Sequence, residues 1–576
     1  MITHMGIPVS PGVAIGEALV LDQERIRIPR RFVSRDAVEE ELERLRRAVD
    51  QVADDISQNR DLITAELGEQ YGAIFAAHLA MLRDPTLQQS WERLIRQEYY
   101  SPEHAVSSTL RKYAAVFERM PQRYLAERAH DVLDLERSLL RRLLGLRREE
   151  LTQINTPVVV LAHDLTPNET ASLDRTKVLG FATEIGGAGG HVAIVARALE
   201  IPAIVGVGPF LAEVEPGDLV IVDGDSGQLI LRPDPATREH YQQQADKART
   251  LARGWERHCH EPALTLDQQH VQVHANIEFP REVEVCLERG ADGIGLYRTE
   301  FLYLSGDHEP NEEEHFQAYR EVAQRMAGRP VVIRTLDLGA DKLGGSYADY
   351  QEPNPFLGLR SIRLSLRHMP LFRCQLRAIL RASAYGNLRI MFPMIATVNE
   401  LRRAKAVLAD AQEDLAEQGV PFSWPIPVGI MIEVPAAVLM LDQLLPEVDF
   451  VSIGTNDLAQ YVLAVDRSNR EVADLYRETD PAVIRLIDTT VRQCQAHGKA
   501  VSLCGQMSAN PLCTPLLIGL GLRALSVPPA NIPEIKHVCR SVSAADCQKL
   551  AQRVLQMESA REVEHCLREE LKKIRP

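Results

Sequence analysis

PVGIMIEVPAAVLMLDQLLPEVDFVSIGTNDL, residues 427–458, contains the pattern that decides the fold of this chain. Two apolar runs, 427–435 and 450–458, flank a helix-favouring stretch, and each run has polar residues near its carboxyl end, Glu433 in the first and Asn456 with Asp457 in the second. Six further runs of this kind follow residue 270, with helical stretches between them: 271–277, 293–296, 330–338, 388–395, 499–505 and 524–527. Eight strands that alternate with helices predict a parallel (β/α)8 barrel, with some other α/β sheet as the alternative.

The amino-terminal quarter has a different sequence pattern. Residues 6–20 mix Pro, Gly and β-branched residues, which favours short strands and turns. From Asp36, with Glu39 three residues on, apolar residues recur at helical spacing and predict a helix hairpin or coiled-coil seam broken by Asn59. Helix-favouring sequence then continues, and the sequence predicts a helical bundle over 21–145.

Two residues in this bundle are expected interruptions, Gly68 and Pro121. Between 155 and 232 the pattern changes to strand, turn and helix, and ends in a predicted hairpin around Asp223-Gly224 or Ser226-Gly227. This part predicts a compact α/β domain. The polar stretch 236–257 favours a helical connector between domains.

Composition narrows the class of protein. A chain of 576 residues exceeds what one core usually serves, so we expect two to four domains. Its nine cysteines show no CxxC pair and no disulfide-like spacing, which fits a reducing cytoplasm. No apolar run approaches the roughly 18 residues of a membrane span, so membrane insertion and export are not expected. The net charge of −15 argues against nonspecific nucleic-acid binding.

Polar residues recur at the carboxyl ends of the predicted barrel strands, where the active sites of such barrels lie. Singly, an Arg or Glu at a strand end is often only solvated or paired, but recurrence on six strands indicates a site. The residues are Asn276, Arg298, Arg334, Glu433, Asn456 with Asp457, and Cys504.

Two carboxylates at adjacent strand ends, Glu433 and Asp457, suit Mg²⁺, with a structural salt bridge as the alternative. The guanidinium groups of four arginines suit phosphate and carboxylate and stay charged. These arginines are Arg298, Arg334, Arg360 and Arg467. A pocket for a small anion with a metal is what phosphoryl transfer requires.

Cys504 follows an apolar strand and precedes Gly505. A strand cysteine is ordinarily a buried, inert thiol. At the catalytic end of a barrel, a proton-donating role competes with that interpretation.

His191 lies in GGAGGHVAIVARALEIPAIVG, residues 186–206. Four glycines before it allow a tight turn and close approach of another molecule, and the following residues predict a helix. A helix N-terminus favours an anion, so a phosphorylated imidazole would be stabilised there. A lone histidine is more often structural, and the other sixteen lack such surroundings. His258-Cys259-His260 has no further ligands nearby and fits a solvated linker better than a metal site.

Several longer stretches accompany that histidine segment. They are DLTPNET (164–170), GIGLYRTEFL (293–302), IRTLDLGADK (333–342), NPFLGLRSIR (354–363), IMFPMI (390–395), GIMIEVPAA (429–437), FVSIGTNDLAQYVLAVDR (450–467) and LCGQM (503–507). Together they resemble Enzyme I of the bacterial phosphoenolpyruvate:sugar phosphotransferase system over essentially the whole chain.

This resemblance implies a domain organisation. A discontinuous phosphohistidine α/β domain (1–20 and 146–232) is interrupted by the helical bundle (21–145), which binds the carrier protein. A helical linker (233–260) leads to a (β/α)8 barrel (261–576) that binds phosphoenolpyruvate and forms a homodimer. The overall class is multidomain α/β.

The resemblance also implies roles for residues of this chain. His191 resembles the phosphorylated nucleophile, and Cys504 resembles the acid that protonates the leaving enolate to give pyruvate. Glu433 and Asp457 resemble the Mg²⁺ ligands. The substrate clamp corresponds to Arg298, Arg334, Arg360, Asn456 and Arg467.

The expected acceptor resembles HPr, the histidine-containing phosphocarrier. Seven acidic residues against two arginines between Asp50 and Asp84 favour a basic partner, with a merely solvated helix face as the alternative. The acidic residues are Asp50, Asp54, Asp55, Asp61, Glu66, Glu69 and Asp84, and the arginines are Arg60 and Arg83.

The chain departs from the family pattern at two places. Ala188-Gly189-Gly190 stands where the family has Arg-Thr-Ser, and Gln506 replaces an acidic residue after Cys-Gly. Two alternatives remain at this point: a dikinase or synthase relative, which would carry a large nucleotide-binding domain, and a non-catalytic regulator that binds phosphoenolpyruvate or a carrier. The sequence does not decide between sugar uptake and regulation.

Overall fold

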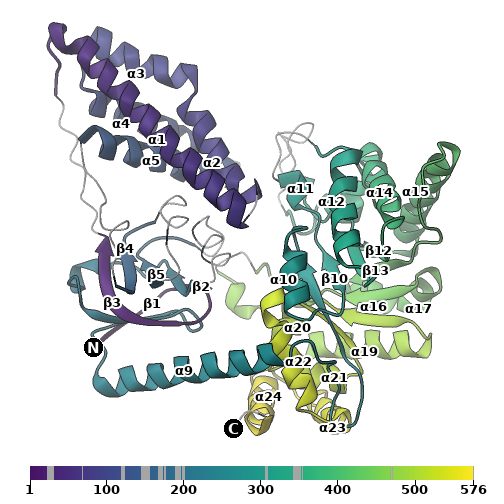
Figure 1. Ribbon diagram of the computed structural model, residues 1–576. Helices are drawn as coiled ribbons and strands as arrows, with labels where there is room; N and C mark the ends of the chain where they lie inside the picture. The colour runs from purple at the N-terminus through teal and green to yellow at the C-terminus, as the bar shows by residue number, and fades with distance from the viewer. Residues whose placement is uncertain are drawn as a thin grey trace. The chain divides into compact units, whose positions relative to one another are not determined.

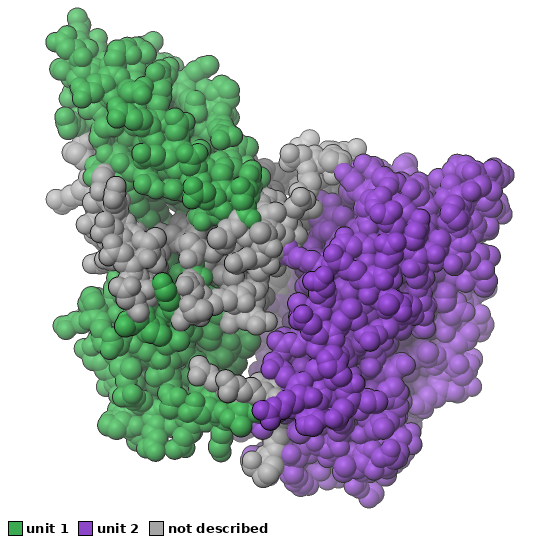
Figure 2. Space-filling model, in the orientation of Figure 1, with its two compact units in different colours: residues 1–250 green, residues 251–576 purple. Residues whose placement is uncertain are grey.

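The computed structural model describes most of the chain in two compact units, residues 1–250 and 251–576 (Figure 2). The described residues are 1–21, 31–67, 69–118, 123–144, 156–165, 173, 177–187, 192, 196, 201–304, 309–340, 352, 354–467, 469 and 471–574. No helix within these ranges combines the length and apolar character that crossing a bilayer requires.

An eight-stranded sheet with the order β1-β8-β7-β3-β4-β5-β6-β2 organises the first unit (Figure 1). Strand β3 precedes the helices in sequence and β4 follows them, yet the two pair in parallel, with Glu17 opposite Val158 and Leu21 opposite Ala162. The sheet therefore joins segments from both sides of the helical region. The strands are β1 Ile2–Met5, β2 Ile7–Ser10, β3 Val13–Leu21, β4 Val158–Ala162, β5 Val178–Thr183, β6 Ala203–Val205, β7 Leu219–Asp223 and β8 Gln228–Leu231.

The predicted hairpin is present between β7 and β8. These strands pair antiparallel from Val220 with Leu231 to Asp223 with Gln228. Asp223 closes the turn, because its carboxylate accepts hydrogen bonds from the backbone N–H groups of Asp225 and Ser226. An aspartate that binds the backbone two residues on is typical of such turns.

Between β3 and β4, the described residues form five helices. They are α1 Val38–Leu67, α2 Glu69–Leu82, α3 Pro85–Glu98, α4 Pro102–Glu118 and α5 Arg123–Leu144. The apolar stripe of α1, which includes Leu42 and Ile56, is buried together with Trp91 and Leu139 from other helices. Helical spacing of apolar residues therefore produced the packed face that the sequence predicted.

Two details of the predicted helix need comment. The backbone of α1 continues past Asn59, where the apolar seam was predicted to break, as far as Leu67; a polar side chain removes no backbone hydrogen bond from a helix. The helical turn also begins before Asp36: Ser34 is extended and a 3-10 turn over Arg35–Ala37 leads into α1. Gly68 and Pro121 lie outside the described residues.

Helix α9, Pro235–Arg257, corresponds to the connector predicted at 236–257. It starts in the first unit, and its residues from Leu251 onward belong to the second. Asp234 precedes it and accepts a hydrogen bond from the Thr237 backbone at 2.8 Å, which caps the helix.

The second unit contains a closed barrel of eight strands, and neighbouring strands are parallel throughout. This confirms the predicted (β/α)8 fold. The strands are β9 Gln272–Ile277, β10 Ile294–Tyr297, β11 Val331–Arg334, β12 Leu388–Phe392, β13 Val428–Ile432, β14 Phe450–Ile453, β15 Ala500–Leu503 and β16 Ala524–Val527. Each predicted apolar run contains one of them, apart from Tyr297, which lies one residue beyond its run.

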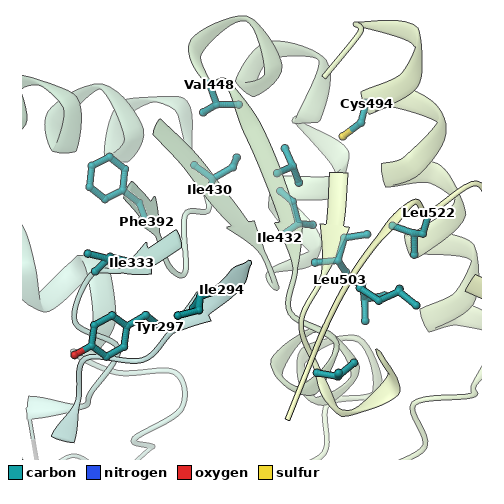
Figure 3. Close-up of a cluster of buried hydrophobic side chains, with 14 of the residues drawn as sticks. Ile294, Tyr297, Ile333, Phe392, Ile430, Ile432, Val448, Cys494, Leu503 and Leu522 are labelled. Atoms are coloured by element: carbon teal, nitrogen blue, oxygen red, sulfur yellow. The ribbon is translucent and has the colours of Figure 1, made fainter. Parts of the chain in front are cut away.

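The barrel is surrounded by helices that cover the outward-facing side chains of the strands. The helices are α10 Glu282–Glu288, α11 Phe301–Leu304, α12 Glu312–Arg325, α13 Ser361–Ser365, α14 Met369–Ser383, α15 Val398–Glu417, α16 Pro435–Leu439, α17 Leu441–Leu444, α18 Thr455–Leu463, α19 Pro481–Ala496, α20 Gln506–Ala509, α21 Thr514–Gly519, α22 Ile532–Arg540, α23 Ala544–Val554 and α24 Ala560–Ile574. Side chains such as Ile333, Ile430 and Leu503 form the core of this layer (Figure 3).

Among its described residues, the second unit has two buried histidines. His274 lies on β9, and His315 lies on α12, where its Nδ1 is 2.8 Å from the Tyr319 hydroxyl. Burial lowers the pKa of each imidazole to about 4, from an ordinary value of 6.5. Both histidines are therefore neutral in the folded protein at pH 7.

These two histidines predict that the second unit is sensitive to acid. Between pH 6.5 and 4 the unfolded chain binds protons that the folded unit does not, so the free energy of unfolding falls as the pH is lowered. Each histidine contributes a loss of on the order of 3 kcal/mol by pH 4. Urea denaturation at pH 7 and pH 4.5 measures this slope. His315→Gln flattens it, whereas the exposed control His497→Gln leaves it unchanged; equal slopes for the two variants would contradict the prediction.

Candidate active site

A cavity of about 360 Å³ opens at the carboxyl ends of the barrel strands. It gathers all eight barrel residues that the sequence singled out for substrate, metal or proton transfer. Its lining consists of Leu296, Arg298, Arg334, Asp337, Phe356, Arg360, Met431, Glu433, Gly454, Asn456, Asp457, Arg467, Cys504, Gly505 and Gln506. Parallel strands cause this convergence, because all their carboxyl ends emerge at one face of the barrel.

Three carboxylates form an acidic cluster in this cavity. Asp337, Glu433 and Asp457 each offer an oxygen, and these oxygens all lie within 4.8 Å of one another. Glu433 is 2% exposed, and its Oε1 accepts a hydrogen bond from the Met394 backbone N–H at 2.6 Å. Burial, with the charges of Asp337 and Asp457, raises the pKa of Glu433 to about 8. The cluster is thus short of positive charge around Glu433.

Two arginines whose side chains are each 11% exposed flank the acidic cluster. Asp337 bridges them: its carboxylate lies 2.7 Å from Arg334 and 3.1 Å from Arg360. Arg360 also contacts Asp457 at 3.2 Å, and Arg334 contacts Glu300 at 3.0 Å. Burial alone would lower the pKa of both guanidinium groups, but these carboxylates outweigh it and raise both values. Both arginines therefore stay charged and are held at fixed positions.

The remaining arginines lie closer to solvent. The side chain of Arg298 is 35% exposed and pairs with Glu278 at 2.7 Å. Arg467 is exposed, and its backbone N–H donates to Gln460 Oε1 at 3.3 Å. These two cations border the same cavity as Arg334 and Arg360.

Cys504 follows β15 and is 1% exposed. Burial raises the pKa of its thiol, although a hydrogen bond from Ser452 and the charge of Arg334 act in the opposite direction. The thiol is consequently protonated near neutral pH, which is the form that a proton donor needs.

The segment after Cys504 packs closely against the first turn of α18. Asn456 Oδ1 accepts a hydrogen bond from the Gln506 backbone N–H at 2.8 Å. A Cβ on Gly505 would overlap the Thr455 side chain, so glycine is required for this close approach. Asn456, which the sequence suggested for substrate binding, therefore also fixes the loop that carries Cys504.

Sequence reasoning did not single out Asp337 or Glu300. A signal was present, since Asp337 follows the end of β11 by three residues, in IRTLDLGADK. Asn276 was included among the strand-end residues, but it is not among the cavity-lining side chains. It supports the site from below: its Nδ2 donates to the Cys504 carbonyl oxygen at 3.2 Å, and its Oδ1 accepts from Ser526.

The predicted nucleophile His191 lies outside the described residues, as does the preceding Ala188-Gly189-Gly190 segment. The tripeptide His258-Cys259-His260 follows the end of α9; His258 pairs there with Glu261 at 2.7 Å, and Cys259 is buried. Within the described ranges, the acidic cluster is the one group of three metal-ligating side chains close enough to hold an ion.

Models of three phosphoenolpyruvate-utilising domains match the chain in sequence. The N-terminal domain matches residues 5–128, the mobile domain 154–227 and the phosphoenolpyruvate-binding domain 252–544. The last model contains the whole cavity described above. Phosphoenolpyruvate-protein phosphotransferase of Geobacillus stearothermophilus is 44% identical over 97% of both chains, and that of Bacillus subtilis is 39% identical over 98% of this chain and 99% of its own.

The chain belongs to the Enzyme I family. It is therefore a phosphoenolpyruvate-dependent phosphotransferase, and its phosphoryl acceptor is a protein. Enzyme I is also represented among solved structures: an NMR solution structure of Enzyme I is 38% identical, covers 43% of this chain and 99% of its own, and has a TM-score of 0.38. The full-length matches favour Enzyme I over a dikinase, a synthase or a non-catalytic regulator.

Gly505→Ala tests the close packing of Gly505 against the first turn of α18 at the Enzyme I site. The added methyl group overlaps Thr455, and we expect a loss of about 1–3 kcal/mol in stability together with slower pyruvate formation from phosphoenolpyruvate. Thermal unfolding and a pyruvate assay measure the two effects. Gly254→Ala is the matched control, because a Cβ there meets no other atom within 4 Å. Wild-type behaviour of Gly505→Ala would contradict this packing argument.

Proposed function

We propose that this enzyme transfers phosphate from phosphoenolpyruvate to its own His191 and then to a histidine of an HPr-like carrier, with Cys504 as the acid that completes pyruvate. The observation that supports this proposal is the shared cavity, in which cations, carboxylates and a protonated thiol meet. Each of these groups matches one requirement of the reaction.

Binding of the substrate is assigned to the arginines and Asn456. Phosphoenolpyruvate carries a phosphate and a carboxylate, and guanidinium groups bind both kinds of anion with paired hydrogen bonds. Arg334 and Arg360 are already fixed by carboxylates, so little ordering is required when the anion binds. Arg298 and Arg467 supply further positive charge at the cavity wall.

The acidic cluster fits Mg²⁺. Its donors are all carboxylate oxygens, and the raised pKa of Glu433 reflects a surplus of negative charge that a divalent cation would relieve. Glu433 and Asp457 would hold the ion, as the sequence indicated, and Asp337 is an additional candidate. When bound, Mg²⁺ supplies charge neutralisation at the phosphoryl oxygens.

Breaking the phosphorus–oxygen bond leaves the enolate of pyruvate, which needs a proton at C3. Cys504, which directly follows β15, is the protonated group that lines the cavity. Its proton transfer to C3 gives pyruvate and leaves a thiolate. The imidazole of His191 acts as the nucleophile toward phosphorus.

His191 belongs to the part matched by the mobile-domain model, and the cavity belongs to the phosphoenolpyruvate-binding part. Transfer requires the histidine and the bound substrate to meet during the reaction cycle. Such a conformational step often limits the turnover of an enzyme.

For the carrier, the proposed docking region is the helical bundle. Of the acidic residues counted there, Asp50 and Asp54 are exposed and available to a basic partner. Others have structural roles: Asp84 caps α3 through the Thr86 N–H, and Asp55 pairs with Arg142.

We also propose a homodimer and a cytoplasmic location. The barrel unit presents large apolar side chains to solvent, including Leu357, Leu439 and Trp424, as a self-association surface requires. The nine cysteines are all free thiols, which agrees with a reducing compartment.

Labelling with radioactive phosphoenolpyruvate tests the role of His191. Wild-type protein with Mg²⁺ should acquire acid-labile phosphate, and His191→Ala should acquire none while still binding phosphoenolpyruvate, because the barrel cavity is unchanged. His497→Ala, an exposed histidine outside the cavity, is the control. Labelling of His191→Ala at the wild-type level would overturn the assignment.

Asp337→Asn tests the acidic cluster as a Mg²⁺ site. Loss of one of three carboxylates should weaken Mg²⁺ binding by about 10-fold or more, measured by calorimetry without substrate. Asp488→Asn is the control, since Asp488 pairs with Arg492 on α19, outside the cavity. If Asp337→Asn binds Mg²⁺ as the wild type does, Asp337 is not a ligand.

A further inference from the structure

Two serine hydroxyls connect to the thiol of Cys504 inside the barrel. Strands β14 and β15 pair in parallel, and this register places Ser452 opposite Ser502. Ser502 Oγ lies 3.1 Å from Ser452 Oγ, and Ser452 Oγ lies 3.2 Å from Cys504 Sγ. The three side chains therefore form a continuous hydrogen-bonded chain.

The two ends of this hydrogen-bonded series differ in solvent exposure. Ser452 and Cys504 are each 1% exposed, whereas Ser502 is half-buried. Ser502 lies on β15 and Cys504 follows that strand, so Ser502 lies on the amino-terminal side of the thiol, away from the strand ends that line the cavity. The hydroxyls thus lead from a partly exposed group to a buried sulfur without passing through the substrate cavity.

A buried acid that gives up its proton must recover it before the next turnover. The charged groups that act on this thiol are Arg334, Arg298 and Glu433. Each already has a partner: Arg334 pairs with Asp337, Arg298 pairs with Glu278, and Glu433 accepts a hydrogen bond from the Met394 backbone N–H. Ser452 is the hydroxyl that contacts the sulfur. It is therefore the group best placed to supply a proton to a thiolate at this position.

We propose that Ser502 and Ser452 form a proton relay that reprotonates Cys504 after each protonation of the enolate. This inference rests on the proposed role of Cys504 as the acid. The two serines do not touch the substrate in this scheme, and they act through the thiol as positioning residues.

The relay balances in protons and electrons. Cys504 S–H transfers its proton to C3 of the enolate, and the S–H electron pair remains on sulfur. Ser452 then donates its hydroxyl proton to Sγ and takes one from Ser502, which takes one from water. The hydroxide left behind is neutralised by the solvent, and no oxidant or further reactant is required.

Ser502 and Cys504 each have a further hydrogen-bond partner, at a longer distance than the contacts within the series. Ser502 Oγ also lies 3.5 Å from the Val451 carbonyl oxygen, which is longer than its 3.1 Å contact with Ser452. The Cys504 thiol donates to the Ile453 carbonyl oxygen at 3.6 Å, and this leaves sulfur lone pairs free to accept from Ser452. Sulfur can therefore accept the Ser452 hydrogen bond both as a thiol and as a thiolate.

An isotope experiment in D2O separates the relay from a structural role. Full-length phosphorylated protein is incubated with Mg²⁺, phosphoenolpyruvate and carbon-labelled pyruvate. Carbon exchange between pyruvate and phosphoenolpyruvate counts passages through the chemical step, and deuterium in the pyruvate methyl group counts exchange of the Cys504 proton with solvent. In the wild type, deuterium enters with the carbon exchange.

Ser502→Ala and Ser452→Ala should each lower the deuterium taken up per carbon exchange by about fivefold or more, because the same proton returns from sulfur to carbon. Ser502→Thr keeps the hydroxyl and should restore the wild-type ratio. Ser383→Ala, a buried serine on α14, is the matched control and should leave the ratio unchanged.

If Ser502→Ala and Ser452→Ala keep the wild-type ratio of deuterium uptake to carbon exchange, the relay is wrong. The relay is also wrong if deuterium uptake and carbon exchange fall in parallel in these variants. Cys504→Ala separates this failure from that of the proposed function. If Cys504→Ala still takes up deuterium at the wild-type rate, Cys504 is not the acid. If Cys504→Ala loses uptake while both serine variants retain the wild-type ratio, only the relay is wrong.

Discussion

The bridge of Asp337 between Arg334 and Arg360 is the interaction on which the catalytic end of the barrel depends. Two guanidinium groups are held out of bulk water there, which is costly unless carboxylates compensate their charge. Asp337 provides that compensation to both arginines at once. Because its partners come from β11 and from the segment before α13, the same bridge also ties the substrate-facing loops to the strand ends.

An ion at the proposed metal site and the arginines would share the same carboxylates. Asp337 and Asp457 are shared between arginines and the proposed ion site, so neither set of charges dominates the cavity. Glu433 has no arginine within ion-pair distance among the described residues, and its pKa rises accordingly. A site of this kind gains most from binding an anion and a cation together, as phosphoenolpyruvate with Mg²⁺ would be.

The barrel interior also contributes polar groups below the cavity. Ser452, Ser502 and Ser526 replace apolar side chains at positions where a barrel is usually filled by branched residues. Each makes a hydrogen bond, so none is a buried polar group without compensation. Ser526 reaches the Cys504 backbone through Asn276, and Ser452 contacts the Cys504 thiol directly, so the packing of the barrel core positions the proposed acid.

The sequence by itself determined the eight strands, the helical bundle and the residues at the strand ends, because periodicity and chain order are local properties. Only the tertiary structure decided that Asp337 bridges two arginines, that Asn456 holds the Cys504 loop, and that two serines reach the thiol. Those contacts join residues far apart in the chain, and their distances follow from barrel closure and strand register. The uninterrupted helix through Asn59 has the same origin, since packing of its apolar stripe outweighs one polar residue.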